Sequence, residues 1–530
     1  MTPRRLLALL ALCFAGFAPL SAGAEPRTIK LLLSSEPPQM NSARATDQIS
    51  IMLLGHLMEG LTRYGQNGEL IPGIAESWKM DDQRATFQLR RGAVWADGKP
   101  VRAQDFVFAW RTAVDPKTAS EYAFILYPLQ NAEAINAGKL PTSALGVSAR
   151  DDLTLDIAFE KPCGYFLGLT AFPTYLPLRE DFYTQKTGRY GADASDLLTN
   201  GPFKLTSWVH GASLILEKNP LYWDAERLHV DRIEIPYITS DPNTAYNLFL
   251  DKKVDTLGIS KENLDRAQAD RLKMKAFADG SVWYMDFNHR EGRVTKNYHL
   301  RKALQLVFDA KEYVSRVVGI PGTKVGVSLI PSWVPGVSGR FRVEFPLTPT
   351  KPDIEEAKRQ LELARQELGG TIPPLVWLTD DGPAAGRQAE YFQYLFRTRL
   401  GVDLRIDRQI FKQRLAKMTA GEFDIVSAGW GPDFADPMTY AELFTTWNDN
   451  NRGKYNSAEY DALIRKAQST ADPQTRMSAM AAAEKVLLDD VGIVPMNERV
   501  LIYAHQPRVS GIVRHVVGPD PDYTWITLSD

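Results

Sequence analysis

Asp433 is the side chain whose surroundings in the sequence most clearly favour binding chemistry. It lies in the stretch FDIVSAGWGPDFADP, from Phe423 to Pro437, and no basic residue occurs between Phe423 and Tyr440. A carboxylate without a local cation is free to pair with one from elsewhere, and an α-ammonium group would suit it. The alternative is that Asp433 is a turn or helix-capping residue ahead of Pro437 and that Trp430 belongs to the core.

The residues before Asp433 predict a buried strand that ends at a loop. Residues 424–428 form a short, mostly apolar run, which Gly429, Gly431 and Pro432 then interrupt. The two glycines flank Trp430, so they allow another backbone to approach closely beside one large flat side chain. We expect this combination to suit a docked peptide chain.

The sequence lacks the motifs of the common catalytic sites. It contains no GxSxG, HExxH, CxxC, Walker or GxGxxG motif, and its seven histidines are scattered. A solitary histidine such as His56 or His289 is therefore expected to be structural rather than a metal ligand. No carboxylate pair stands out for acid–base chemistry. We expect a non-enzyme without metal or cofactor, with a secreted hydrolase as the distant alternative.

Composition and length indicate an ordinary globular protein. The chain has 530 residues, is 44% hydrophobic and carries a formal net charge of −2. This length suggests two or three domains, and the balanced charge gives no reason to expect nucleic acid as a partner.

The first 24 residues predict a secretory signal peptide. Arg4 and Arg5 precede an apolar run from Leu6 to Ala18, and the small residues 22–24 favour cleavage after Ala24. The apolar run is short for a membrane span, and no later stretch reaches the length of about 20 apolar residues that a span needs. We expect export by the Sec route and a soluble mature chain in the periplasm.

The two cysteines bear on the same prediction. Cys13 could be the acylation site of a lipoprotein signal, but Leu12 stands where a small residue is usual, so simple cleavage is preferred. Cys163 is then the one cysteine left, and the mature chain can form no intramolecular disulfide.

Hydrophobic periodicity predicts a mixed α/β chain with an inserted α+β part. The pattern predicts a strand over 28–33, a helix through Ile51, Leu54, Leu57, Met58 and Leu61, hairpin strands through Trp78, Phe87, Leu89, Val94 and Trp95, and a helix with Phe106, Trp110 and Val114 on one face. Further along, it predicts an irregular segment over 331–352 and a helix over 353–368, followed by strand–helix alternation from Leu375 to Ala428 in the βαβ manner.

A series of short strings gives the chain a family resemblance. They include EGLTRY, PGIAESW, FQLRRGAVWADGKPV, AQDFVFAW, NGPFKLTSW, LEKNPLYWD, VDRIEIP, HLRKALQLVFD, FDIVSAGWGPDFADP and GIVPM, in that order along almost the whole mature chain. Together they resemble the bacterial extracellular solute-binding proteins of the oligopeptide and dipeptide class, the binding subunits of ABC importers.

The resemblance implies a periplasmic-binding-protein-like fold with discontinuous lobes joined by a hinge. Lobe I would comprise 25–58, 183–280 and 499–530; lobe II would comprise 59–182; lobe III would comprise 281–498. The ligand cleft would lie between lobes I and III. The implied partners are short peptides and an inner-membrane ABC permease, and the protein is expected to be a monomer.

The resemblance also implies which residues bind the ligand. The aspartate after the AGW loop, which grips the amino terminus of a peptide in this family, matches Asp433. The residues that pair with the peptide backbone match Gly429, Trp430 and Gly431 on one wall and Thr46 to Gln48 on the other. The aromatic positions that line the family's site match Tyr122, Tyr284 and Phe411, each of which could equally be core.

Three positions depart from the pattern of the enteric oligopeptide binders. Thr46 replaces a glutamate, while Ser427 and Met418 replace two arginines, the first of which meets the carboxyl end of a short peptide. Another cation, such as Arg387, Arg405 or Arg414, could take that role, or the ligand could differ in length. Other members carry nickel complexes, haem, opines, sugars or murein peptides, and these remain alternative cargoes.

Overall fold

The computed structural model describes residues 25–186 and 188–529. The predicted signal peptide, Cys13 included, lies outside the described residues. The described chain is a mixture of α-helices and three main β-sheets, which confirms the predicted fold class. In this part of the chain, no helix is long and apolar enough to cross a membrane.

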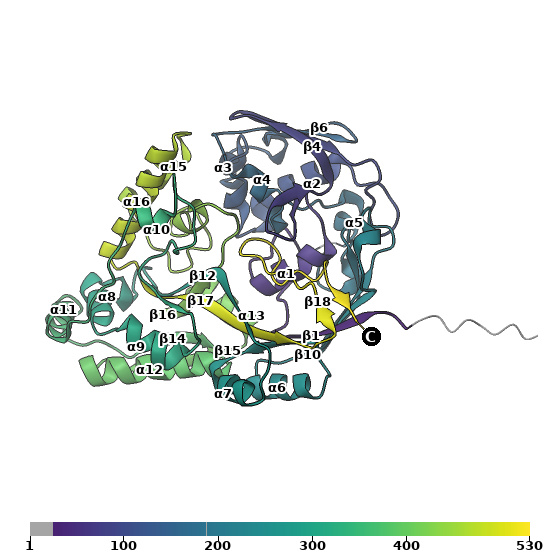
Figure 1. The fold of residues 1–530 in the computed structure, drawn as a ribbon. Coiled ribbons are helices and arrows are strands. Elements are labelled where there is room, and N and C mark those ends of the chain that lie inside the picture. Colours follow the sequence, from purple (N-terminus) through teal and green to yellow (C-terminus); the bar gives the residue numbers. More distant parts are fainter. Residues whose placement is uncertain (1–24, 187, 530) are drawn as a thin grey trace, which may run out of the picture.

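The first sheet contains the predicted strand over 28–33. Its order is β1 (Thr28–Leu33), β10 (Arg232–Ile238), β9 (Ser213–Lys218) and β8 (Phe203–Val209), with β1 parallel to β10. Along β1, Ile29, Leu31 and Leu33 are buried, as the period of two predicts. Helices α6 (Pro242–Leu250) and α7 (Lys261–Ala269) lie beside this sheet (Figure 1).

The second sheet is antiparallel and contains the predicted hairpin. Its order is β4 (Ala75–Met80), β5 (Arg84–Leu89), β7 (Thr154–Ala158) and β6 (Val147–Asp151). The prediction that Val94 and Trp95 continue the strands is wrong. Val94 instead makes an isolated antiparallel bridge to Pro100 around the turn at Gly98, with backbone hydrogen bonds from Trp95 to Lys99 and from Val101 to Ala93.

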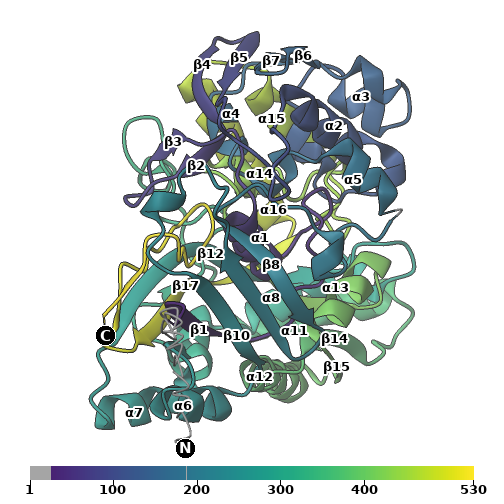
Figure 2. The same cartoon turned by 90° about the vertical axis from the view of Figure 1, so that its right-hand side faces the viewer.

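Short helices and a small hairpin complete this part of the molecule. They are β2 (Thr62–Tyr64), β3 (Leu70–Pro72), α2 (Ala103–Val114), α3 (Ala132–Asn136), α4 (Phe166–Leu169) and α5 (Glu180–Gln185). Figure 2 shows the β4–β7 sheet at the opposite end of the molecule from α6 and α7.

The third sheet has seven strands in the order β11, β17, β12, β16, β14, β15, with β13 paired to β17. The strands are β11 (Thr256–Ile259), β12 (Lys275–Phe287), β13 (Lys324–Val325), β14 (Leu375–Asp380), β15 (Leu404–Gln409), β16 (Ile425–Trp430) and β17 (Ile493–His505). Strands β14, β15 and β16 are parallel and are connected by α12 (Pro383–Leu400) and α13 (Phe411–Ala420), which confirms the predicted βαβ units.

The long strands β12 and β17 run through the middle of the molecule (Figure 1). Their antiparallel register shifts between Ala278 and Val282, around Gly280, whose φ is 78°. A bulge with glycine at positive φ bends a strand and weakens its local pairing. The pairing of β12 with β17, the two strands that connect the ends of the molecule, is therefore irregular around Gly280.

The remaining helices are α1 (Gln48–Leu57), α8 (Tyr298–Leu306), α9 (Ala310–Glu312), α10 (Phe341–Glu344), α11 (Ile354–Glu367), α14 (Met438–Ala441), α15 (Ala458–Gln468) and α16 (Pro473–Asp489). Of these, α1 contacts β8 of the first sheet and α16 contacts β17 of the third, while α14 and α15 pack on α16 and α8 packs on α11. Helix α1 is shorter than predicted, since its C-cap is Met58 and Leu61 lies beyond it. The chain ends in the small pair β18 (Val509–Ser510) and β19 (Thr527–Leu528).

Candidate functional site

Strand β16 extends two residues further than the sequence predicted. It continues through Gly429 to Trp430, because it pairs with β12 up to the contact between Trp430 and Val282. On its other side β14 pairs with β16 at only Ile425 and Val426. In the described chain, the β16 backbone from Ser427 onward therefore has no strand partner on that side.

Both glycines of this segment lie against other side chains. A Cβ atom at Gly429 would come within 2.8 Å of the Trp283 indole, and one at Gly431 within 2.1 Å of Gln48 Nε2. The close approach that the sequence suggested is thus present, and Gln48 occupies the space beside Gly431.

Asp433 is a buried carboxyl group without an ion-pair partner among the described residues. Its side chain accepts a hydrogen bond from the Tyr122 hydroxyl at 3.1 Å, and its backbone N–H donates to Thr439 Oγ1 at 2.9 Å. The residue is 8% exposed, and burial raises the pKa of Asp433 well above its usual range. The neutral hydroxyl of Tyr122 only partly offsets the loss of hydration.

Tyr122 connects Asp433 to Trp430. The Tyr122 ring stacks on Trp430, with 6.1 Å between centroids and 22° between planes. The Trp430 Nε1 atom is buried and has no hydrogen-bond partner in the described chain. The structure therefore brings three predicted site residues together, although Tyr122 comes from a segment about 310 positions away.

The other predicted wall, Thr46 to Gln48, faces two arginines. Arg499 donates to Gln48 Oε1 at 2.8 Å and also pairs with Asp279. Arg452 donates to Thr46 Oγ1 at 3.5 Å. Asp47 caps helix α1 by accepting from the Ser50 N–H, and this cap fixes where the segment turns into the helix.

Arg452 makes a second contact that the sequence did not reveal. It forms an ion pair with Glu121, and Thr419 Oγ1 donates to the same carboxylate at 3.0 Å. The cluster of Thr46, Glu121, Thr419 and Arg452 thus joins three distant parts of the chain. No periodicity or motif marks Arg452 in the sequence, so only the tertiary structure could identify it.

The predicted residues divide between two cavities. Gln48, Gly431 and Asp433 line a cavity of about 220 Å³ that runs along α1, which we call the α1 cavity. Ser427 lines a larger cavity of about 750 Å³ between β1, α6, α7 and the ends of β14 and α12, which we call the cleft cavity. Arg499 lines both cavities.

The remaining predicted residues lie nearby but line neither cavity. Tyr284 is buried and packs edge-on against Phe444, while Phe411 begins α13 and lies under the Arg414 guanidinium. Of the three arginines suggested for a ligand carboxylate, only Arg387 lines the cleft cavity. Arg414 is buried on Asp380, and Arg405 is exposed on β15.

The described residues contain no cluster of acidic, histidine or cysteine side chains that could hold a metal ion. Cys163 is buried and free, and burial raises its thiol pKa above its ordinary value. Such a thiol is not an activated nucleophile.

The sheets of this molecule are built from segments that are distant in the sequence, two long strands connect its ends, and a cavity lies between them. This is the architecture of a solute-binding protein. The family model for bacterial extracellular solute-binding proteins, family 5, matches residues 69–452. The chain belongs to this family.

Relatives and solved structures agree with this assignment. The dipeptide-binding protein DppE of Bacillus subtilis is 32% identical to this chain over 91% of the chain and 89% of DppE. The substrate-binding domain of an oligopeptide ABC transporter from Bacillus anthracis superposes with a TM-score of 0.91 at 34% identity, over 96% and 99% of the two chains. Peptide-bound OppA of Listeria monocytogenes superposes with a TM-score of 0.90 at 30% identity, over 96% and 100%.

Proposed function

We propose that this protein is the peptide-binding subunit of an ABC importer. It holds a short peptide in an extended conformation beside β16 and delivers it intact to a membrane permease. The observation that carries this proposal is the combination of two features: in the described chain, the β16 edge has no strand partner, and the carboxyl group of Asp433 is buried without a cation.

The β16 edge supports recognition of a peptide main chain. A strand with unpaired backbone groups accepts an extended peptide by strand addition, which gives affinity that does not depend on the peptide sequence. Each such hydrogen bond contributes about 0.5–1.5 kcal/mol net. We assign Gly429, Trp430 and Gly431 to this pairing, with Thr46 and Gln48 on the facing wall.

Asp433 supports recognition of a free amino terminus. A buried carboxyl group without a cation carries a desolvation penalty that a bound ammonium group would relieve. Tyr122 orients the carboxylate through its hydroxyl group, and Trp430 holds the Tyr122 ring. Tyr284, Phe411 and Ser427 are assigned to the surrounding walls.

The absence of catalytic motifs supports binding without hydrolysis. We place the mature protein in the periplasm as a monomer, exported by the signal peptide of residues 1–24. The names of DppE and of the Bacillus anthracis and Listeria structures refer to dipeptide binding, oligopeptide transport and bound peptide, and they favour the same cargo class here.

We further propose that lobes I, II and III have the boundaries given above and that the cleft closes about a hinge near Gly280 and Glu498. The register shift in β12 and β17 at this point supports a bend there. Small-angle scattering should show a smaller radius of gyration when peptide is added to protein stripped of ligand. An unchanged radius would contradict the hinge.

The test of the function uses the exported protein purified without refolding. Native mass spectrometry should show short peptides bound, and calorimetry with tripeptides to pentapeptides should show binding with all of the peptide recovered intact. Released amino acids, in a preparation free of contaminating peptidase, would overturn the proposal. A bound non-peptide solute, together with no heat from any peptide, would overturn the cargo.

A further inference from the structure

The α1 cavity continues well beyond Asp433. Its volume is about 220 Å³. Pockets for a whole ligand usually measure about 300–1,000 Å³, a range that includes the cleft cavity but not this one. The size of the α1 cavity suits one side chain rather than a complete ligand.

The part of the α1 cavity nearest the middle of helix α1 is apolar. Ile51, Met52, Gly55 and Met58 line it from one face of the helix, because positions three and four apart point the same way. Pro519 covers Gly55 so closely that a Cβ at Gly55 would lie 2.5 Å from its ring. This region can desolvate an apolar group and offers it no hydrogen-bonding side chain.

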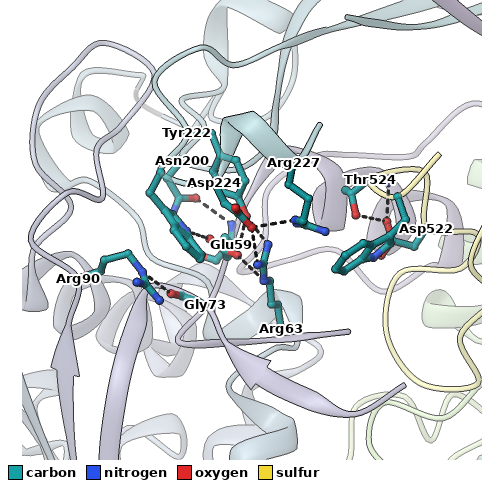
Figure 3. Close-up of polar contacts among 12 residues, drawn as sticks. Glu59, Arg63, Gly73, Arg90, Asn200, Tyr222, Asp224, Arg227, Asp522 and Thr524 are labelled. Carbon is teal, nitrogen blue, oxygen red and sulfur yellow. Dashed lines mark hydrogen bonds and ion pairs between the residues drawn. The ribbon is translucent and has the colours of Figure 1, made fainter. Parts of the chain in front are cut away.

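The far end of the α1 cavity is closed by paired charges. The Glu59 carboxylate accepts from the Tyr222 hydroxyl at 2.8 Å and lies 3.4 Å from Arg63 Nε, while Arg63 and Arg227 share Asp224. Figure 3 shows Arg63 beside Glu59 and Asp224, and Arg227 between Asp224 and Asp522. The group needs no ligand charge to satisfy it.

Two guanidinium nitrogens at this end are buried without a hydrogen bond in the described chain. They are Arg63 Nε, which lies 3.4 Å from Glu59, and Arg227 Nη1, whose guanidinium lies over the Trp525 ring at 3.8 Å. A positively charged ligand group at this end would meet the guanidinium groups of Arg227 and Arg63. The far end therefore disfavours a cationic side chain and accepts a neutral one.

The α1 cavity and the cleft cavity meet beside Gln48. Gln48 and Gly431 line the α1 cavity, and Arg499, which bonds Gln48, lines both cavities. A ligand whose main chain follows β16 in the cleft and whose amine reaches Asp433 must therefore place its first residue at this junction. The α1 cavity is the space open to that residue's side chain.

We propose that the α1 cavity binds the side chain of the first residue of the peptide and selects a long, uncharged, apolar one. This inference rests on the proposed function and specifies the ligand of the same site. Burial of each additional methylene in a fitted apolar pocket changes affinity by about tenfold or more. The lysine ammonium would lose hydration there and gain no carboxylate, since Glu59 and Asp522 already have partners.

The experiment compares three peptides that differ only in the first residue. Norleucine, lysine or alanine precedes three alanines, and norleucine has the stem of lysine without its charge. Calorimetry with the wild-type protein should show the norleucine peptide binding at least tenfold more tightly than either of the others.

A filled cavity provides the second measurement. Ala171 lines the α1 cavity and is half-buried, so Ala171→Leu should shrink the ratio of norleucine to alanine affinities toward one. Ala149→Leu is the matched control, because Ala149 is also half-buried, lies on β6 and lines neither cavity. The control should keep the wild-type ratio.

The outcomes separate the two proposals. If the alanine peptide binds but norleucine gives no advantage, or lysine binds as tightly as norleucine, the α1 cavity has another role and the inference is overturned. A norleucine advantage that survives Ala171→Leu unchanged also overturns it. If none of the three peptides binds, the proposed peptide function itself is wrong.

Discussion

The two ends of the proposed peptide site differ in whether their charged groups already have ion-pair partners. At the Asp433 end, a buried carboxyl group has no ion-pair partner in the described chain. In the cleft cavity, the Arg387 guanidinium already pairs with Glu262, and Arg499 and Arg514, which line both cavities, already pair with Asp279 and Asp520. An unpaired buried charge selects a ligand, whereas paired charges mainly shape the space around it.

This difference explains what Ser427 contributes. Its hydroxyl group is buried and without a partner in the described chain, and it carries no charge. Among the described residues, a ligand carboxylate would find in the cleft cavity no guanidinium that is free of its own carboxylate, and the Lys261 ammonium there already donates to the Arg316 carbonyl oxygen. We therefore expect the protein to recognise the amino end of a peptide strongly and the carboxyl end weakly.

The largest loss of peptide affinity is expected when the charge of Asp433 is removed. Asp433→Asn keeps the shape of the side chain but leaves a bound ammonium desolvated and unpaired, which costs about 2–5 kcal/mol. At tenfold per 1.4 kcal/mol, affinity should fall roughly thirtyfold to several thousandfold in calorimetry.

The matched control for this variant is Asp449→Asn. Asp449 is exposed and pairs only with Lys454, so its replacement should leave affinity unchanged. The wild type should reject an N-acetylated peptide, whereas Asp433→Asn should bind free and acetylated peptides with much more similar affinities. Equal binding of free peptides by Asp433→Asn and wild type would mean that Asp433 is only a turn residue.

The pH dependence of binding should depend on Asp433. Because burial raises the pKa of Asp433, the unliganded carboxyl group holds its proton to a higher pH than an exposed aspartate does, and a bound ammonium favours loss of that proton. Affinity should therefore rise with pH, by at most tenfold per pH unit, as long as the peptide amine stays protonated, which holds until about pH 7.7–8.0.

Calorimetry in buffers of different ionisation enthalpy would count the released protons. Wild-type protein is expected to release protons when peptide binds, and Asp433→Asn to release fewer. Burial also raises the pKa of Asp286 and of Glu442 to about 7, so the slope that remains in Asp433→Asn measures their share. Equal proton release by both proteins would exclude Asp433 as the source.

Local patterns in the sequence predicted much of the fold. The period of two over 28–33 and the capped, periodic helix before Gly369-Gly370 act within a few residues, and both elements form as expected. The end of β16 was missed by two residues because pairing with β12 keeps Gly429 and Trp430 extended despite the nearby glycines. Tertiary pairing here outweighs local propensity.

Local patterns in the sequence predicted only part of the candidate site. Asp433 stood out because it has no basic neighbour in the sequence, and Gly431 because glycine permits close approach. Arg452 and Arg499 carry no such signal, since their partners Glu121 and Asp279 are more than 200 positions away. The division of the site into two cavities likewise depends on packing between distant elements.

A weaker effect is expected from the Arg452 cluster. Glu121 accepts from both Arg452 and Thr419, so it joins segments that would separate if the cleft opened. Glu121→Gln removes the charge and replaces one acceptor oxygen by an amide donor, so it weakens a partly exposed pair worth about 1 kcal/mol, and affinity should fall roughly fivefold.

The control is Glu312→Gln, because Glu312 pairs with Arg316 one helical turn away and joins no distant segments. Scattering from ligand-free protein should show a larger mean radius for Glu121→Gln than for the control. Identical radii and affinities would mean that the Arg452 cluster does not stabilise the closed form.

The smallest effect is expected at the carboxyl end of the peptide. A C-terminal amide removes the negative charge and replaces one acceptor oxygen by an NH2 donor, while the peptide keeps its shape and its other hydrogen-bonding groups. Because Arg387 pairs with Glu262 and Arg499 with Asp279, a carboxylate would have to compete for donors that are already engaged. We expect amidated and free-acid forms of the same tetrapeptide to differ in affinity by about threefold or less in calorimetry, near the limit set by a single exposed pair.

Arg387→Gln should leave this ratio unchanged. A loss of tenfold or more on amidation, abolished by Arg387→Gln, would show that Arg387 leaves Glu262 to bind the ligand, and the contrast between the two ends would disappear.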